Sequence, residues 1–308
     1  MNMNILNIIE EMEKVDGAVY ERLSPRRSAL QHLLNVGKKV SLAAIPLTLS
    51  TMFQKAYSQT TPNTAAIDSL NLVLALGYMQ FQFYNNALTA TPTLIPVADK
   101  PIVTALRDQE QAHINVLTKA ITDLGGMPRA LMPYANFDYT RVNANVTTNY
   151  GTFLRTAVAL EDLSERAYKG QLITLMGTSV LATAVRIHTI EARHSAQLRQ
   201  MVNKLQIATL KYMRPWVSIR RNDADGADVT PITGNDSMIG TLNPVYDIDP
   251  GLLNRETKTI QAGIELIGIG GNINLTAGPA AESFDEYLST STVKTAANLF
   301  IKTGFQLT

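Results

Sequence analysis

Two stretches of this sequence share one pattern: RDQEQAHINVL at Arg107–Leu117 and HTIEARHSAQL at His188–Leu198. Each has a glutamate, a histidine three residues later and a leucine four residues after the histidine. Side chains three residues apart lie on one face of an α-helix, so the carboxylate and the imidazole of each stretch are expected to point at the same place. One Glu-x-x-His is usually a surface pair. Two copies, each at the centre of a long predicted helix, indicate a shared polar interior.

The two predicted helices that precede these stretches also repeat each other. LGYMQFQFY at Leu76–Tyr84 aligns with LEDLSERAY at Leu160–Tyr168, with leucine first and tyrosine last in both. In this alignment Gly77 stands opposite Glu161, and the glutamate of the next helix follows after 33 residues in one case and 30 in the other. The chain therefore has the organisation of two related helical hairpins, each expected to supply one Glu and one Glu-x-x-His.

Proline and glycine residues indicate where four long helices stop. We expect helices at residues 64–90, 101–124, 149–176 and 179–212, and the short connections make the first two and the last two antiparallel hairpins. Residues 125–148, rich in Pro, Asn and Tyr, are too many for an ordinary loop and fit one long crossover along a bundle. The predicted fold class is all-α, a four-helix bundle with one long crossover.

The sequence predicts three parts. Residues 1–60 form an N-terminal leader or helical arm, residues 61–213 the bundle, and residues 214–308 a loop-rich C-terminal extension with a final helix near 291–302. Within the extension, the apolar patch Ile260–Ile269 is expected to be a strand or a short helix.

Composition narrows the possible functions of the 308-residue chain. A formal net charge of +1 gives no electrostatic reason to expect a nucleic-acid partner. The absence of cysteine excludes thiolate metal sites and cysteine nucleophiles. A metal site that uses histidine must draw on the four in the chain, which are His32, His113, His188 and His194. No apolar run reaches the roughly 20 residues that a membrane-spanning helix needs, so none is expected.

The N-terminal segment has two interpretations. The apolar run Val40–Phe53 follows basic residues and precedes a small-x-small site at Ala56–Ser58, which together describe an export signal. Ser24–Leu30 (SPRRSAL) also resembles a twin-arginine motif, although a proline separates the serine from the arginine pair. On this interpretation the protein is exported, to the periplasm or the cell surface of a bacterium. The alternative is an uncleaved helical arm and a cytoplasmic protein.

Residues 64–205 resemble the ferritin-like domain group that includes the desiccation-related proteins of bacteria and plants, especially the exported forms. The stretches that carry the resemblance are ALEDLSERAYKG, DQEQAHINVL and IEARHSAQLR. The resemblance implies a ferritin-like four-helix bundle around a non-haem di-iron carboxylate centre. Such a centre takes a Glu from each of two helices and a Glu-x-x-His from each of the other two.

The sequence departs from that pattern at one ligand. Similar proteins carry Glu where this chain has Gly77, and usually a second Glu where it has Gln80. Five expected metal ligands remain, namely Glu110, His113, Glu161, Glu191 and His194. The resemblance implies that Glu161 and His194 serve one metal, that the glutamates of the two motifs bridge, and that a second metal keeps only His113 and the bridges. We therefore expect a degenerate site that holds iron or another divalent metal, with one or none per chain.

The sequence leaves open whether the protein is an enzyme. Beside the metal-binding interpretation stands a structural one, in which a ferritin-like scaffold has lost its metal chemistry. On that interpretation the N-terminal segment and the C-terminal extension make assembly contacts, for example between the copies of a homo-oligomer.

Overall fold

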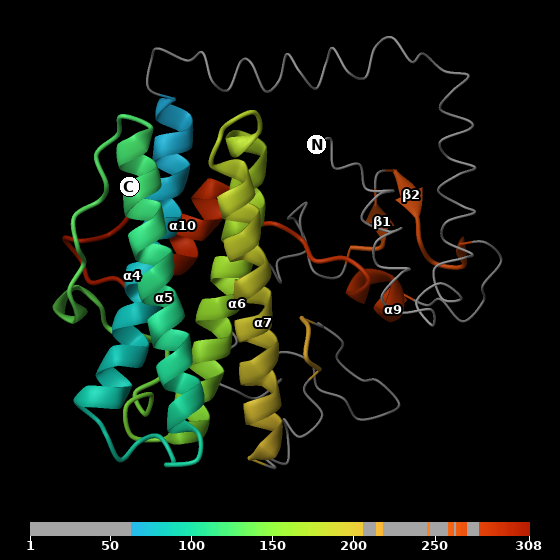
Figure 1. Cartoon of the computed structure of the whole chain (residues 1–308). Coiled ribbons are helices and arrows are strands. Elements are labelled where there is room, and N and C mark those ends of the chain that lie inside the picture. The colour runs from blue at the N-terminus through green and yellow to red at the C-terminus, as the bar shows by residue number, and fades with distance from the viewer. Residues whose placement is uncertain (1–62, 206–213, 218–244, 247–257, 262, 270–276) are drawn as a thin grey trace, which may run out of the picture. The chain divides into compact units, whose positions relative to one another are not determined.

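Four long helices, lying side by side in Figure 1, make up most of the structure, which is a computed structural model. They are α4 (Thr64–Thr89), α5 (Lys100–Asp123), α6 (Tyr150–Leu175) and α7 (Leu181–Lys204). Helix α4 packs against α5 and α6, and α6 packs against α7. The structure describes residues 63–205, 214–217, 245–246, 258–261, 263–269 and 277–308. The predicted all-α bundle built from two hairpins is confirmed.

Local sequence explains where these helices begin and end. The side chains of Asn63 and Asn149 accept hydrogen bonds from backbone N–H groups in the first turns of α4 and α6, which satisfies donors that a helix start leaves free. Gly125 and Gly177 follow α5 and α6 with φ of 76° and 77°, a conformation that glycine adopts without steric cost.

The bounds of the first three helices differ from the predicted ones by one residue at most. Helix α7 ends at Lys204, and Leu205 is its C-cap. The predicted continuation to residue 212 falls on residues 206–213, which lie outside the described part of the chain.

The crossover runs from α5 to α6 and contains two 3-10 turns, η1 (Tyr134–Asn136) and η2 (Tyr139–Arg141). The Tyr139 hydroxyl donates a 2.6 Å hydrogen bond to the Met79 carbonyl of α4. The Tyr139 ring also packs beside Phe83, at a centroid distance of 4.9 Å. These contacts hold the crossover along the bundle.

The described part of the C-terminal extension contains a short antiparallel pair, β1 (Ile260–Gln261) with β2 (Ile264–Glu265), and two helices, α9 (Ala277–Glu282) and α10 (Thr290–Asn298). Of the two possibilities for the patch around residues 260–269, the structure shows the strand.

The final helix is shorter than predicted, because residues 300–302 pair with the crossover instead of continuing α10. The Asp138 N–H donates to the Phe300 carbonyl at 2.8 Å, and the Lys302 N–H donates to the Asn136 carbonyl at 2.9 Å. The last residues of the chain therefore connect the crossover to the bundle.

No helix in the described ranges is both long enough and apolar enough to cross a bilayer.

The extension lies directly on the backbone of α6. The Leu288 N–H donates a 3.1 Å hydrogen bond to the Arg166 carbonyl. A Cβ atom placed on Gly170 would lie only 2.0 Å from the Leu288 carbonyl oxygen. Only glycine permits this approach, because the obstructing atom belongs to the backbone and cannot rotate away.

Replacing Gly170 tests how strongly the extension is bound to the bundle. We expect Gly170→Ala to lower the free energy of unfolding by about 1–3 kcal/mol, because steric overlap outweighs the better helix propensity of alanine. Chemical denaturation measures this change. Ile173→Ala, at an exposed position of the same helix, is the control and should change stability little. A Gly170→Ala protein as stable as the control would show that the contact is not required.

Candidate metal site

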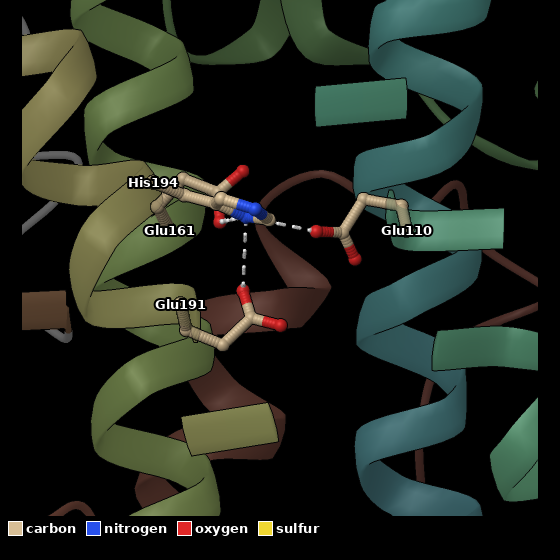
Figure 2. Close-up of side chains that lie close together, drawn as sticks. All are labelled: Glu110, Glu161, Glu191 and His194. Atoms are coloured by element: carbon tan, nitrogen blue, oxygen red, sulfur yellow. Dashed lines mark hydrogen bonds and ion pairs between the residues drawn. The ribbon is translucent and has the colours of Figure 1, made fainter. Parts of the chain in front are cut away.

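Four side chains from three helices meet inside the bundle (Figure 2). Each of Glu110, Glu161, Glu191 and His194 offers one ligand atom, and these atoms lie within 4.8 Å of one another. The four residues are at most 4% exposed. Three carboxylates this close repel one another in a low-dielectric interior unless a cation or hydrogen-bond donors compensate them.

The two histidines contact the carboxylates crosswise. His194 Nδ1 lies 3.2 Å from Glu110 Oε1, on the other hairpin. His113 Nδ1 lies 3.0 Å from Glu191 Oε1, again on the other hairpin. Each histidine is farther from the glutamate of its own motif, at 3.9 Å for His194 and 3.5 Å for His113. The two Glu-x-x-His motifs are thus related by an approximate twofold symmetry, which their repeat in the sequence predicts.

That symmetry breaks at position 77. His194 Nδ1 has a third carboxylate neighbour, Glu161 Oε2, at 3.3 Å. Glu161 also accepts a short hydrogen bond from the Tyr84 hydroxyl. The corresponding tyrosine is Tyr168, and the position that corresponds to Glu161 is Gly77, which has no side chain to offer it.

Helix α4 contributes Gln80 to the site in place of a carboxylate. Its Nε2 donates to Glu161 Oε2 at 2.8 Å and to Glu191 Oε2 at 3.1 Å. The amide is neutral, so it relieves part of the repulsion between these two carboxylates without adding a negative charge.

Gln109 fixes the orientation of the His194 ring. Its Oε1 lies 2.8 Å from His194 Nε2, and a carbonyl oxygen can only accept, so Nε2 carries a proton. The other nitrogen, Nδ1, then faces the carboxylates. Metal-binding histidines commonly have this arrangement, in which one ring N–H donates to an oxygen and the other nitrogen is available to the ion.

Ion-pair interactions raise the pKa of both histidines. Burial lowers the pKa of His113, but the Glu110 and Glu191 carboxylates outweigh burial and raise it to about 10. For His194, burial lowers the pKa, while the charge of Glu161 and the contacts to Glu110 and Glu191 raise it to about 11. Without a metal, both rings are therefore protonated at neutral pH.

The polar atoms of the cluster fit a bound cation. Neither oxygen of Glu110 accepts a hydrogen bond from the described residues, and His113 Nδ1 has no partner of hydrogen-bonding geometry there, although carboxylate oxygens lie close. These polar atoms lie close together but without hydrogen-bonding geometry between them. Ligands that surround a common ion are arranged in the same way. Carboxylates with imidazole suit Fe²⁺, Mn²⁺ or Zn²⁺.

The five predicted ligands are brought together by the structure, and their assignment as ligands stays a prediction. His113 lies at the edge of the four-residue group and contacts it through Glu110 and Glu191. His188 does not join the cluster, since its Nδ1 contacts the Glu165 carbonyl at 3.1 Å.

Sequence reasoning missed a second buried polar network directly beside the first. Asp162, next to Glu161, accepts short hydrogen bonds from Ser195, next to His194, and from Arg199. The Tyr246 hydroxyl of the C-terminal extension donates to the same carboxylate at 2.8 Å. Asp162 and Arg199 are both fully buried. The adjacency of Asp162 and Ser195 to the predicted ligands Glu161 and His194 was the one signal available in the sequence.

The architecture and the cluster define a class: a helical bundle protein with a buried carboxylate–histidine site. Comparison with known families agrees, because residues 65–204 match the ferritin-like domain family. The match runs from the second residue of α4 to the last residue of α7, so this part of the chain is similar to a ferritin-like domain. No curated protein matches the sequence.

Metal binding at this site should release protons. The raised pKa values mean that the two imidazolium groups stabilise the metal-free fold below about pH 6.5, and that this stabilisation is lost as the pH rises through about 10 to 11. A divalent ion must displace at least the Nδ1 proton of His194, so affinity should increase between about pH 6 and about pH 8.

Isothermal titration calorimetry with Co²⁺, in buffers of different ionisation enthalpy, counts the released protons. We expect at least about one per bound ion. Binding that is independent of pH, with no proton released, would contradict a site built on these histidines.

Proposed function

We propose that this protein binds one divalent transition-metal ion, such as Fe²⁺, inside its ferritin-like bundle. One observation carries the proposal. His194 presents Nδ1 to the carboxylates of Glu110 and Glu161 at 3.2 and 3.3 Å, while Gln109 holds the opposite nitrogen. Buried carboxylates and an imidazole oriented in this way form a ready-made set of ligands.

Charge balance favours one ion over two. The cluster has three carboxylates, and one divalent ion together with a protonated His113 neutralises them. Neutrality matters because an uncompensated charge is costly to bury. Two divalent ions would leave an excess positive charge, since Gly77 provides no fourth carboxylate. The site is therefore a degenerate version of a two-metal carboxylate centre.

A bound iron ion would supply one-electron redox chemistry. The residues of the chain would hold the ion, orient His194 through Gln109 and keep Glu161 in place through the hydroxyl of Tyr84. Burial raises the pKa of Tyr84 well above its usual range, and the negative charge of Glu161 raises it further. The tyrosine therefore stays a neutral hydrogen-bond donor. We therefore propose metal binding as the function, with iron-dependent oxidation as its extension.

We also propose that the protein works in the bacterial cell envelope, in keeping with the resemblance to exported desiccation-related proteins. The support is the N-terminal sequence, with its arginine pair, apolar run and small-x-small site. These residues lie outside the described part of the structure.

A structural role on a scaffold without metal chemistry is the second candidate. Two observations favour it. Gln80 and Tyr84 donate hydrogen bonds to the carboxylates and satisfy part of the cluster without an ion. Around the β1–β2 hairpin of the extension, isoleucines are 44–55% exposed, and such apolar surface suits contacts with another chain. The exposed isoleucines are Ile260, Ile264, Ile267 and Ile269.

Metal content of two histidine variants separates the candidates. Purified wild-type protein should hold at most about one tightly bound divalent ion per chain, and His194→Ala should lose it, because the only imidazole of the four-residue group is gone. His188→Ala, on the same helix but outside the cluster, is the matched control and should keep the wild-type content. Elemental analysis gives the stoichiometry, and the metal-induced rise in Tm gives an independent reading. Wild type that binds no ion would favour the structural candidate.

Processing of the N-terminus tests the proposed location. We expect native protein to begin near Gln59, because signal cleavage follows the small-x-small site. Intact-mass spectrometry of protein from the source cells detects the new terminus. A persistent Met1 in mature protein would contradict an export signal, without bearing on the metal site.

A further inference from the structure

The four sides of the bundle are closed unequally. Helix α4 packs closely against α5 and α6, and α6 against α7, but the backbones of α5 and α7 approach each other at few points. The cluster lies ten residues or more from both ends of each helix that carries it, which is about 15 Å of helix. A path from solvent to the cluster is therefore shorter through a side of the bundle than through an end.

Three of these sides are joined by buried contacts at the level of the cluster. Between α6 and α7, Ser195 donates a hydrogen bond to Asp162, and both residues are at most 3% exposed. Between α4 and α5, Ile114 lies so close to Gly77 that even a Cβ atom there would be in tight contact. Between α4 and α6, the buried Tyr84 hydroxyl donates to a carboxylate of the cluster.

On the fourth side, the seam between α5 and α7, an exposed residue contacts the cluster. Gln109 of α5 is exposed, yet its Oε1 lies 2.8 Å from Nε2 of His194 on α7. His194 itself is only 4% exposed. His113 lies one turn from Gln109 on the same face of α5, and at 8% it is the most exposed of the five predicted ligands. The cluster comes nearest to solvent here.

We propose that the seam between α5 and α7 is the route by which the cluster exchanges its metal ion with solvent, and that Gln109 gates this route. This inference rests on the proposed metal function. It gives Gln109 a kinetic role in addition to the orientation of His194.

The contact of Gln109 is suited to opening and closing. Because the residue is exposed, its amide can turn into solvent, where water replaces the contact to His194, so opening costs no more than one net hydrogen bond. Rotamer changes of exposed side chains are also fast. Opening uncovers the Nε2 edge of His194 and frees the ring, whose Nδ1 faces the carboxylates of Glu110 and Glu161.

The test is stopped-flow mixing of the full chain with Co²⁺, followed by the visible absorbance of the bound ion, and a chelator chase for its release. We expect Gln109→Ala to raise the association and dissociation rate constants about fivefold each, the factor that one net hydrogen bond contributes. A gate acts on both directions alike, so Kd should change little. A residue that only orients His194 would change the dissociation rate constant alone.

Gln111→Ala is the matched control, because it removes the same side chain two residues further along α5. Gln111 donates a hydrogen bond to Asn115 of its own helix, and both rate constants should stay at the wild-type values.

A charge placed on the seam tests the route itself. Val116 is exposed and shares a helix face with Gln109 and His113. Val116→Lys should slow the association of Co²⁺, and added salt should reverse the effect, because a positive charge at the entrance repels the ion. Asn115→Lys adds the same charge to the adjacent exposed residue on the outer face of α5 and should slow association less.

Each outcome bears on a different claim. If Gln109→Ala raises the dissociation rate constant alone, or neither rate constant, Gln109 is not a gate, while metal binding stands. If Val116→Lys slows association no more than Asn115→Lys does, the route lies on another side of the bundle. If wild type binds no Co²⁺ at all, the proposed function fails and the inferred route fails with it.

Discussion

Three carboxylates buried within a few ångströms of one another are the constraint on which the rest of this structure depends. Glu110, Glu161 and Glu191 come from three helices, so the bundle can close only if their mutual repulsion is compensated. The chain supplies two imidazoles, the amide of Gln80 and the hydroxyl of Tyr84 for that purpose. A divalent ion would compensate the carboxylates more completely, because it concentrates charge at the point that all of them face.

Glycine at position 77 makes the two halves of this site unequal, although the contacts of the two histidines remain similar. The crosswise contacts of His113 and His194 preserve the approximate twofold relation between the hairpins. Because Gly77 has no side chain, only His194 has a third carboxylate neighbour, Glu161, and the two halves of the site differ in charge. In the helix interior glycine costs roughly 1 kcal/mol relative to alanine, so helix propensity does not explain its presence. Its Cα lies against Ile114 closely enough that a Cβ would be in tight contact, which gives one packing reason.

The sequence was sufficient to predict the bundle, because helical periodicity, helix-stop residues and the repeat of Glu-x-x-His all agree on it. The repeat also predicted that the side chains of the cluster meet, because two hairpins of similar sequence are expected to place their Glu-x-x-His motifs in similar positions. Gln109 and Asp162 could not be predicted in the same way. Their partners, His194 and Arg199, lie on other helices, and which side chains meet depends on the rotation of each helix about its axis. The end of α10 was missed for a related reason: residues 300–302 pair with a crossover that is remote in sequence.

The second buried network links the extension to the helices that carry the carboxylate–histidine cluster. Ser195 donates a hydrogen bond to Asp162, and these two residues directly follow His194 and Glu161 in the sequence. This contact therefore sets the register of α6 against α7 at the level of the cluster. Losing one partner of a buried ion pair such as Asp162 with Arg199 strongly destabilises a fold, and the buried hydroxyl of Tyr246 in the extension donates a hydrogen bond to the same carboxylate. Tyr246, which lies outside the four-helix bundle, therefore takes part in a charged contact inside it. Asp162 and Ser195 lie on α6 and α7, the helices that carry Glu161 and His194, so a shift between these two helices would also separate the side chains of the cluster.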